Sequence, residues 1–366
     1  MNLAILLNAD SELLEDDPGR VAREDVNRVA RALAEALLSK GLRAELITFG
    51  ADPSVGLERL FKRRPDVALN LCESLGADSR GEMAIPSLLE GLGIPYTGTG
   101  ALGLGLALHK NKAKELLLAR GVSTPPFAVV SDLSQLAAVR VPFPAIVKPA
   151  REDASVGIDF DSVVRDPKAL ERAVKAVHDR FGQPALVEAF IAGREIYVPL
   201  LGNAPREALP LSEIQFGKAF EGKPNIVSYK AKWECDSPEF VDSNSGLCAL
   251  DAPLRETLVQ TARAAFEALE CRDYGRVDLR LSADNIPFVI DVNPNCDLNP
   301  EAGFAKAAQA AGIDYATLAF RLVEIALERQ HEHSSHHLHG SRTPGAAASP
   351  DRELHPGGGG LRAGAH

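Results

Sequence analysis

The fold of this chain is decided by residues 274–295, which read Tyr274-Gly-Arg-Val-Asp-Leu-Arg-Leu281, the turn Ser282–Asn285 and then Phe288-Val-Ile-Asp-Val-Asn-Pro-Asn295. Apolar and polar residues alternate on both sides of the turn, which predicts two β-strands joined as a hairpin. Side chains on a strand alternate between its faces. Arg276 and Asp278 therefore share one face of the first strand, and Asp291 and Asn293 share one face of the second.

Pairing of these strands would bring two carboxylates, an amide oxygen and a guanidinium onto one patch. Mg²⁺ prefers a few protein carboxylates combined with phosphate oxygens. The hairpin thus predicts a magnesium–phosphate site with Asp278, Asp291 and Asn293 as ligands. A solvated hairpin face is the simpler interpretation. It explains the alternation, but it does not explain why every polar position is occupied by a residue type that can bind a metal ion or a phosphate.

The composition is that of a globular protein. The chain has 366 residues, of which 45% are hydrophobic and 25% are charged, enough for a sizeable core. The net charge of −10 argues against a nucleic-acid partner, which needs a cationic surface. No apolar run reaches membrane-spanning length, and Met1–Ala9 lacks the basic and apolar regions of a leader. The five cysteines are scattered without a CxxC pair, so we expect a cytoplasmic protein without a disulfide framework or zinc site.

Strand and helix patterns alternate ahead of the hairpin, and the amino-terminal part predicts a small open parallel sheet. Its expected elements are strands at 3–7, 44–49, 67–71 and 94–96 and helices at about 23–39 and 83–92. Farther along, the patterns predict strands at 145–149, 185–191 and 195–201 and helices at about 110–120, 170–181, 253–269, 303–311 and 315–329.

The composition changes abruptly after Gln330. His331–His366 contains seven of the nine histidines and the glycine run 357–360. Such a segment buries too little apolar surface to offset its ordering entropy, so we expect it to be disordered. Its histidines could bind Ni²⁺ or Zn²⁺, but their irregular spacing favours a flexible extension.

Two lysines are candidate phosphate contacts. Lys148 ends an apolar strand and precedes the small-residue loop 149–157, which contains Ser155. A lysine can reach a phosphate as a point charge, and the loop's backbone N–H groups can approach phosphate oxygens closely. A surface lysine before a mobile loop is the alternative. Lys110 begins a helix, and by itself it indicates only a basic helix terminus.

Two further signals are weak when taken alone. Glu188 and Glu195 flank a strand–turn–strand segment, where exposed carboxylates could bind an adenine amino group and a ribose hydroxyl. Two surface glutamates are the simpler interpretation, and the spacing alone favours it. Lys232 precedes the single tryptophan, Trp233, and is either a phosphate contact or a stem that packs on the ring.

In their order along the chain, these residues resemble the ATP-grasp superfamily, and within it the D-alanine–D-alanine ligase-like branch. The resemblance extends from Val67 to Leu327. It rests on Gly81-Glu82, Leu88–Glu90, Ile94–Gly98, Lys110 and Lys114 with Gly121–Pro125, Lys148–Gly157, Glu188, Glu195, Lys232, Gly275–Asp278 and Asp291–Asn293.

The resemblance implies a mixed α/β and α+β architecture, the ATP-grasp fold. A Rossmann-like pre-ATP-grasp domain at 1–100 would precede two α+β lobes that clamp ATP. The central lobe with the phosphate loop would occupy 101–184, the carboxy-terminal lobe with the metal hairpin 185–330, and the tail 331–366. A homodimer through the first domain is also implied.

The resemblance further implies ATP and Mg²⁺ as cofactors, with Mn²⁺ as a possible substitute. Contacts to the nucleotide are implied for Lys110, Lys148, Glu188, Phe190, Ile191, Glu195, Lys232 and Ile290. The implied metal ligands are Asp278, Asp291 and Asn293, and the implied catalytic residues are Arg276, Lys232 and Ser155. A substrate carboxylate would attack the γ-phosphorus, and an amine would then displace phosphate from the acyl phosphate. Arg276 would stabilise the tetrahedral oxygen, and the loop Asp153–Gly157 would exclude water.

Several positions depart from the family pattern. Leu7–Glu12 lacks the family's glycine pair, which leaves Glu12 as a candidate substrate-side carboxylate. The other departures are Cys72–Arg80 in place of a His-Gly motif, His109 in place of aspartate, Asp291 in place of glutamate, and Ala154 and Trp233 in place of a serine and a tyrosine. After Asn293, a family Ser-Pro-Gly and a later serine become Pro294–Glu301. We expect Asp297 and Glu301 to line the acceptor site, repel an acceptor carboxylate and favour a positive group.

The predicted function is an ATP-dependent carboxylate–amine ligase of the acid–amino-acid type. Its partners would be small-molecule carboxylates and amines, without nucleic acid or membrane. The alternatives are a true D-alanine–D-alanine ligase of peptidoglycan synthesis, a non-catalytic ATP-binding module and a small-molecule kinase. Arg276 favours a ligase, because a protein that only binds a nucleotide has no need of an oxyanion partner.

Overall fold

A computed structural model describes residues 1–8, 20–50, 52–76, 78–153 and 155–339 of the chain. Glu12 and Ala154, which the sequence analysis singled out, lie outside these residues. Met1–Gln330 forms one unit of the chain, and His331–His366 forms a second. The domain boundaries expected within the first unit stay predictions.

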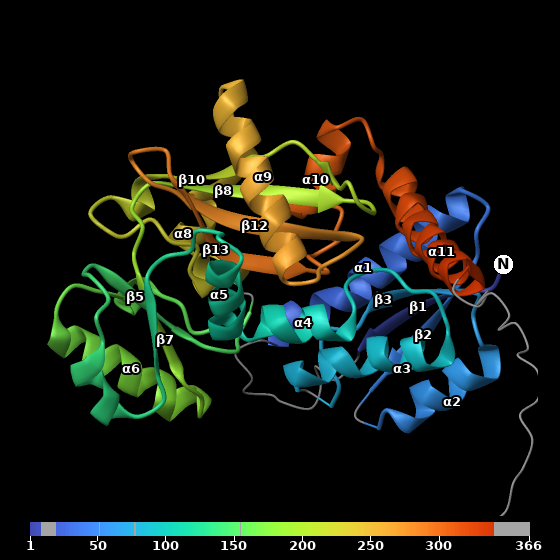
Figure 1. The fold of residues 1–366 in the computed structure, drawn as a ribbon, viewed down its shortest axis with the longest axis horizontal. Helices are drawn as coiled ribbons and strands as arrows, with labels where there is room; N and C mark the ends of the chain where they lie inside the picture. The colour runs from blue at the N-terminus through green and yellow to red at the C-terminus, as the bar shows by residue number, and fades with distance from the viewer. Residues whose placement is uncertain (9–19, 51, 77, 154, 340–366) are drawn as a thin grey trace, which may run out of the picture. The chain divides into compact units, whose positions relative to one another are not determined.

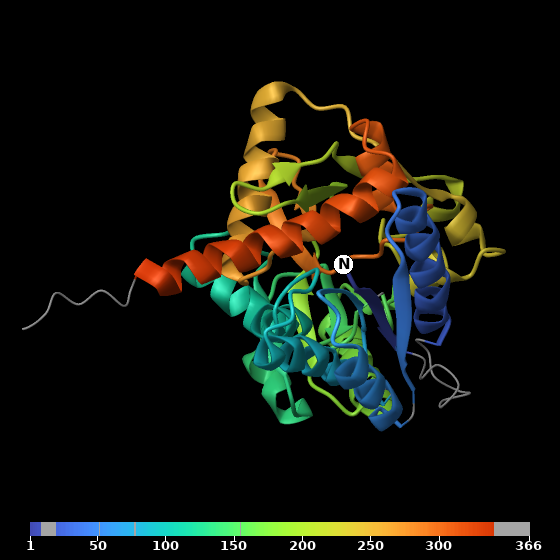
Figure 2. The ribbon, with the colours of Figure 1, turned by 90° about the vertical axis from the view of Figure 1, so that its right-hand side faces the viewer.

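The amino-terminal sheet is parallel, as the sequence predicts, with the strand order β2-β1-β3. Its elements are β1 (Leu3–Asn8), α1 (Arg20–Ser39), β2 (Ala44–Phe49), α2 (Ser54–Arg63), β3 (Val67–Leu71), a 3₁₀ turn (Ser79–Met83) and α3 (Ala84–Leu92). Successive residues of β1 enter different cores. Ile5 packs in the core that contains residues of α1, whereas Leu6 packs in the core that contains residues of α2 and α3. Helices therefore cover both faces of this sheet, and α1 lies beside its strands in Figure 2.

The predicted strand at 94–96 is wrong. The segment makes a single parallel bridge between Tyr96 and Ala68. Pro95 has no backbone N–H to donate to a ladder, which limits the pairing to the carbonyl of Pro95 and the N–H of Thr97.

The second sheet is antiparallel, with the order β4-β7-β5-β6. It consists of β4 (Phe127–Val130), β5 (Ala145–Pro149), β6 (Val163–Val164) and β7 (Ala185–Ala189), and it is covered by α6 (Pro167–Phe181). Asp166 caps α6 by accepting from the N–H of Ala169, and Gly182 ends the helix in the left-handed conformation. Figure 1 shows β5 and β7 side by side. Lys148 lies on β5 and Glu188 on β7, so this sheet positions both side chains.

The third and largest sheet has the order β11-β10-β8-β12-β13, with β9 paired to β8. Its strands are β8 (Arg194–Leu201), β9 (Glu207–Ala208), β10 (Ser212–Phe216), β11 (Ser243–Leu247), β12 (Tyr274–Leu281) and β13 (Pro287–Pro294). The helix α9 (Ala252–Ala268) lies across one face of this sheet (Figure 1). Its residues Leu258, Ala262 and Phe266 are fully buried. The predicted hairpin is confirmed, because β12 and β13 pair antiparallel.

The remaining helices are α4 (Ala101–Leu108), α5 (Lys110–Ala119), α7 (Tyr229–Trp233), α8 (Pro238–Val241), α10 (Gly303–Ala310) and α11 (Tyr315–His339). Short 3₁₀ turns lie at Leu133–Ala138, Phe160–Ser162 and Lys218–Phe220. Because α11 continues to His339, the prediction of disorder from His331 onward is wrong for 331–339. The rest of the predicted tail, 340–366, lies outside the described residues.

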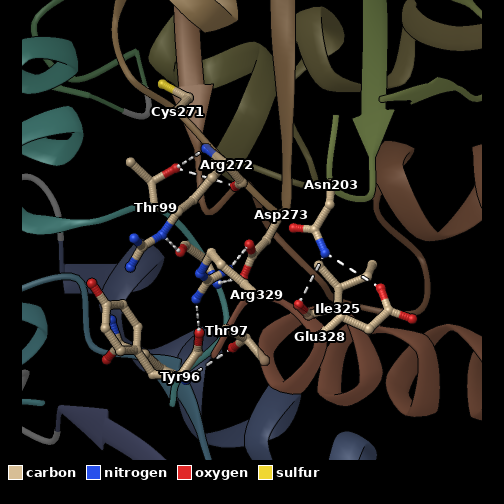
Figure 3. Close-up of polar contacts among 12 residues, drawn as sticks. Tyr96, Thr97, Thr99, Asn203, Cys271, Arg272, Asp273, Ile325, Glu328 and Arg329 are labelled. Carbon is tan, nitrogen blue, oxygen red and sulfur yellow. Dashed lines mark hydrogen bonds and ion pairs between the residues drawn. The ribbon is translucent and has the colours of Figure 1, made fainter. Parts of the chain in front are cut away.

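A buried carboxylate joins three segments that are far apart in the sequence (Figure 3). Asp273 is fully buried and forms an ion pair with Arg329 of α11. Its second oxygen accepts from the N–H of Gly98 at 2.8 Å, and Arg329 donates to the carbonyl of Tyr96 at 2.6 Å. Thr99 follows Gly98 in the chain, and its backbone N–H donates a hydrogen bond to Oδ1 of Asn295 at 2.7 Å. This network therefore ties the end of the amino-terminal α/β segment to the residues that follow β13.

Candidate functional site

The hairpin brings its polar residues together as the alternation predicts. In the β12–β13 register, Asp278 lies opposite Asp291, and Arg276 lies opposite Asn293. The amide nitrogen of Asn293 donates to Oδ2 of Asp278 at 3.1 Å. Two carboxylates, an amide and a guanidinium thus form one patch.

Within this patch, Arg276 and Asp278 form a bidentate ion pair. The Nε–Oδ1 distance is 2.6 Å and the Nη2–Oδ2 distance is 2.8 Å. The guanidinium also stacks over the Tyr197 ring, 4.3 Å from its centroid. Burial raises the pKa of Asp278, Asp291 and Glu195 raise it further, and Arg276 opposes the shift. The carboxylates therefore form a site that favours an additional cation.

The donor set fits a magnesium ion that shares its coordination with phosphate. Among the described residues, His, Cys, Asp and Glu side chains form no group of three that could hold a metal ion. The hairpin accordingly offers two carboxylates and one amide, and Mg²⁺ characteristically completes its octahedron with water and substrate oxygens. The metal-binding role of Asp278, Asp291 and Asn293 stays a prediction.

Lys110 joins the hairpin to the loop that follows β5. Its Nζ lies 2.8 Å from Asp153 and 3.0 Å from Asp291, and its backbone N–H donates to the carbonyl of Ala150. The side chain is 7% exposed. Burial alone would lower the pKa of Lys110, but the two carboxylates raise it above its usual value. A permanently charged ammonium is thereby placed between the loop and the hairpin.

A second buried cluster lies around Glu188. Its carboxylate, 1% exposed, pairs with Lys114 and with Lys148, whose Nζ is 2.7 Å from Oε2. Burial alone would raise the pKa of Glu188, but the two lysines lower it to about 2. The expectation of an exposed Glu188 is therefore wrong, and this carboxylate orients two lysines.

Glu195 is buried as well, so the expectation of an exposed carboxylate is also wrong for this residue. It accepts from the hydroxyl of Tyr197 at 2.9 Å and pairs with Arg280 at 2.7 Å. Arg280 also lies over the Phe190 ring, 5.4 Å from its centroid. Arg280 was not among the predicted site residues, although the strand alternation that places Arg276 and Asp278 on one face places Arg280 there too.

These residues surround a cavity that we name the lysine cavity. It is lined by Lys110, Pro125, Ile146, Lys148, Glu152, Asp153, Ser155, Ile158, Glu188, Ala189, Phe190, Ile191, Glu195, Ile226, Val227, Asp278, Arg280, Ile290 and Asp291. Every residue predicted to contact the nucleotide lies here, except Lys232. The sequence carried no signal for Ile158, Ile226 and Val227, which long-range packing brings to the cavity.

A second cavity, of about 220 Å³, is named here the acidic cavity. Its walls include Val26, Val29, Asn70, Leu71, Cys72, Glu73, Ser79, Glu82, Leu104, Glu152, Asp153, Val156, Lys232, Trp233, Tyr274, Asn293, Asn295, Cys296, Asp297 and Leu298. Glu152 and Asp153 line both cavities. Lys232 was predicted to contact the nucleotide. It lies on α7 and lines the acidic cavity.

The structure separates the two carboxylates that were expected to face the acceptor. Asp297 lines the acidic cavity. Glu301 does not, because its side chain is 85% exposed and lies near Lys306 at 3.7 Å. The expectation for Glu301 is wrong, because this side chain is exposed and is not among the residues that line the cavity.

A family model described as the D-ala D-ala ligase C-terminus matches residues 119–324, which include every residue that lines the lysine cavity except Lys110. The chain belongs to the D-alanine–D-alanine ligase family. Membership makes it an ATP-dependent ligase that forms amide bonds.

Relatives of similar length support this membership. The chain is 33% identical to a D-alanine–D-alanine ligase of Methylacidiphilum infernorum, over 85% of this chain and 93% of the relative. It is 35% identical to a D-alanine–D-alanine ligase of Syntrophobacter fumaroxidans, over 76% and 86% of the two chains. An uncharacterized protein of Sinorhizobium fredii, y4sG, is 33% identical over 85% and 88%.

Solved structures of the family share the ATP-grasp fold. The D-alanine–D-alanine ligase of Bacillus anthracis complexed with ATP superposes with a TM-score of 0.69 at 23% identity, covering 91% of this chain and 99% of that one. The Coxiella burnetii ligase gives a TM-score of 0.65 at 18% identity, over 92% and 97% of the two chains. No helix in the described part of the chain is both long and apolar enough to cross a membrane.

Proposed function

We propose that this ligase uses ATP to convert a substrate carboxylate into an acyl phosphate, which an amine attacks to form the amide. One observation carries the proposal. Asp278 and Asp291 line the lysine cavity, while Asn293, from the same hairpin, lines the acidic cavity. A phosphoryl group held at the hairpin thus lies between a nucleotide in the first cavity and a substrate in the second.

The lysine cavity has the character required for a nucleotide. Phe190, Ile191 and Ile290 provide an apolar wall for the base, and the buried Glu195 offers an acceptor for ribose hydroxyls. Lys110 and Lys148 supply positive charge for the triphosphate. Lys110 would exchange one of its two carboxylate partners for a phosphate oxygen, while Glu188 holds Lys148 in place.

Asp278, Asp291 and Asn293 would hold Mg²⁺, or Mn²⁺ in its place. The ion, when bound, neutralises charge on the phosphates during phosphoryl transfer. Arg276 is fixed by Asp278 and by the Tyr197 ring. It would stabilise the oxyanion that forms when the amine adds to the acyl carbon.

The reaction balances as two displacements. A carboxylate oxygen attacks the γ-phosphorus, and ADP leaves with the electron pair of the broken P–O bond. The amine, after one ammonium proton has passed to water, attacks the acyl carbon. Inorganic phosphate leaves with the C–O electron pair, and the nitrogen loses a second proton. Ser155 lies in the left-handed region at φ 61° and lines the lysine cavity, in the loop after β5. This loop would protect the acyl phosphate from water.

The second candidate is D-alanine–D-alanine ligation, which is favoured by the names of relatives that this chain matches over most of their length. A binding module without turnover is the candidate from another class. A homodimer stays a prediction, which sedimentation of the full chain would check.

The experiment is a screen of acid–amine pairs for ATP-dependent phosphate release, followed by mass spectrometry of the products. Calorimetry with Mg²⁺ and a non-hydrolysable ATP analogue runs in parallel. Release that requires both an acid and an amine supports the ligase reaction. Release with a hydroxyl compound alone would indicate a kinase, and nucleotide binding without any release would indicate a binding module.

A further inference from the structure

Two asparagine side chains in the wall of the acidic cavity have an amide nitrogen without a partner. Asn70 lies on β3, and Asn295 follows β13. Nδ2 of the fully buried Asn70 has no hydrogen-bond partner among the described residues. The half-buried side chain of Asn295 forms its one hydrogen bond within the described part of the chain through Oδ1, so its Nδ2 is also unpaired there.

Backbone donors fix the orientation of both amides. The N–H of Cys72 donates to Oδ1 of Asn70 at 3.3 Å, and the N–H of Thr99 donates to Oδ1 of Asn295 at 2.7 Å. A backbone N–H can donate to the oxygen of an amide side chain but not to its nitrogen, which is itself a donor. These two bonds therefore assign the oxygen of each side chain and leave each nitrogen for another acceptor.

One buried turn contacts both asparagines. The N–H of Asn70 donates to Oγ1 of Thr97 at 3.1 Å, and Thr99 holds Asn295 as described above. Between these threonines, Gly98 leaves room for the second amide, because a Cβ added there would lie 2.2 Å from Oδ1 of Asn295. Both threonines are fully buried. The two amides are therefore held by the same rigid segment of the wall.

The donors belong to the substrate half of the site. Neither asparagine lines the lysine cavity, where the nucleotide would bind. Asn293 lines the acidic cavity from the hairpin, where the reacting oxygens of the acid would meet the phosphoryl group. The donors of Asn295 and Asn70 remain for an oxygen of the second substrate, the amine. A buried donor without an acceptor costs free energy, so an amine that brings an acceptor is favoured.

We propose that Asn295 and Asn70 are specificity-determining residues, which donate hydrogen bonds from Nδ2 to a carbonyl or carboxylate oxygen of the amine substrate. The proposal rests on the ligase function proposed above. The two amides select an amine with such an oxygen over an amine of the same shape without one. A carboxamide and a carboxylate share this acceptor chemistry, and the amines tested below distinguish them.

Three amines with one skeleton test the proposal. Alaninamide, alanine and isopropylamine share the CH(CH₃)NH₂ group and carry a carboxamide, a carboxylate or a methyl group. Alaninamide and isopropylamine are both single cations at neutral pH, so the ratio of their dissociation constants isolates the acceptor oxygen. We expect alaninamide to bind about tenfold or more tightly than isopropylamine, because isopropylamine leaves both amides unpaired.

Calorimetry of the full chain, with Mg²⁺ and a non-hydrolysable ATP analogue present, measures the three affinities for each enantiomer of alaninamide and alanine. If isopropylamine binds most weakly, the proposal is supported, and the order of the other two identifies the oxygen. Tighter binding of alanine identifies a carboxylate, and tighter binding of alaninamide identifies a neutral carbonyl.

The left-handed backbone of Asn295, at φ 51°, allows two precise substitutions. Asp and Gly also adopt this conformation. Asn295→Asp keeps the oxygen that accepts from Thr99 and removes the donor, and its added charge acts on both cations alike. Asn295→Gly removes the whole side chain. Each should lower the preference for alaninamide over isopropylamine by about threefold or more, because one hydrogen bond is lost.

Asn285→Asp is the matched control. Asn285 also has a left-handed backbone, at φ 59°, but it lies on the exposed turn of the hairpin and not in the cavity wall, so the preference should stay unchanged. Asn70→Ala should lower the preference in the same direction as the Asn295 variants. Thermal melting establishes that each variant folds.

The binding measurements separate this proposal from the ligase proposal. If no amine supports phosphate release, the ligase proposal fails, and the ratio of dissociation constants still decides the present one. Isopropylamine binding as tightly as alaninamide would overturn it, as would the absence of binding by all three amines. A preference that is unchanged in both Asn295 variants would overturn it as well.

Discussion

The guanidinium of Arg276 donates two hydrogen bonds to the carboxylate of Asp278, two residues away on the same face of β12. This pairing places the proposed oxyanion partner against a proposed metal ligand. A change of charge at the proposed metal position should therefore also affect the reacting carbonyl, because the buried Arg276–Asp278 ion pair adjoins both.

Removing the guanidinium should separate nucleotide binding from amide formation. We expect Arg276→Ala to lower product formation by about 100-fold or more, because a preorganised donor to a developing oxyanion is lost. The affinity for the nucleotide should change by much less, because Arg276 does not line the lysine cavity. Product analysis and calorimetry measure the two quantities. Product formation at the normal rate would exclude the oxyanion role.

The opposite strand carries the second proposed metal carboxylate. Asp291→Asn should weaken binding of the Mg²⁺ complex of an ATP analogue by about tenfold or more, with a smaller effect when Mg²⁺ is chelated. Calorimetry with and without a chelator gives both affinities. Asp284→Asn, on the exposed turn of the same hairpin, is the control and should bind normally. Equal losses with and without Mg²⁺ would count against metal ligation.

The Glu188 cluster should contribute to stability at neutral pH. Its pKa of about 2 lies below the ordinary value of 4.5, so its contribution is complete above pH 4.5 and is lost as the pH falls toward 2. The shift corresponds to about 3 kcal/mol, and Glu188→Gln should lose a similar amount because two buried lysines lose their partner.

Denaturant unfolding of Glu188→Gln and of the unmodified chain at several pH values tests this prediction. The difference between the two should be largest above pH 4.5 and should shrink on acidification. The control Glu115→Gln removes an exposed partner of Lys112 and should cost little. A difference that does not depend on pH would show that the charge of Glu188 is not its source.

The hydrogen-bond network around Asp273 should position the wall of the acidic cavity rather than the nucleotide site. Gly98 has φ +95°, and a Cβ added there would lie 2.2 Å from Oδ1 of Asn295, which lines the acidic cavity. Gly98→Ala should therefore raise KM for the amine substrate several-fold and leave KM for ATP nearly unchanged.

Gly91→Ala is the matched control for this substitution. Gly91 lies within α3, where an added Cβ meets nothing within 4 Å, and alanine there should stabilise the chain by about 0.5–1 kcal/mol. Steady-state kinetics with each substrate varied in turn measures the effect of both substitutions. Equal increases in both KM values for Gly98→Ala would indicate a general structural loss.

Much of the site follows from local pattern. The alternation along 274–295 correctly predicts that Arg276, Asp278, Asp291 and Asn293 gather on one patch, because a paired strand presents every second residue to the same side. The same rule places Arg280 on that face of β12, where it pairs with Glu195. Apolar strands and amphipathic helices likewise predict the parallel amino-terminal sheet, except at Pro95.

Burial could not be predicted in this way. Glu188 and Glu195 have the spacing of surface glutamates, yet each is buried against lysine or arginine from a distant segment. Glu301 was expected in the substrate site on the same charge argument as Asp297, but only Asp297 faces the cavity. Whether a carboxylate is buried depends on what packs over it, and that information lies elsewhere in the chain.

The sequence by itself determined the family and the pairing of the hairpin at 274–295, because these depend on short segments whose geometry is set by strand periodicity. Only the tertiary structure decided that Lys110 joins Asp153 to Asp291, that Lys232 lines the acidic cavity, and that Glu73, Glu82 and Asp297 line the same cavity. Each of these neighbours comes from a segment far away along the chain. Local pattern determines which face a side chain takes, whereas long-range packing determines what that face meets.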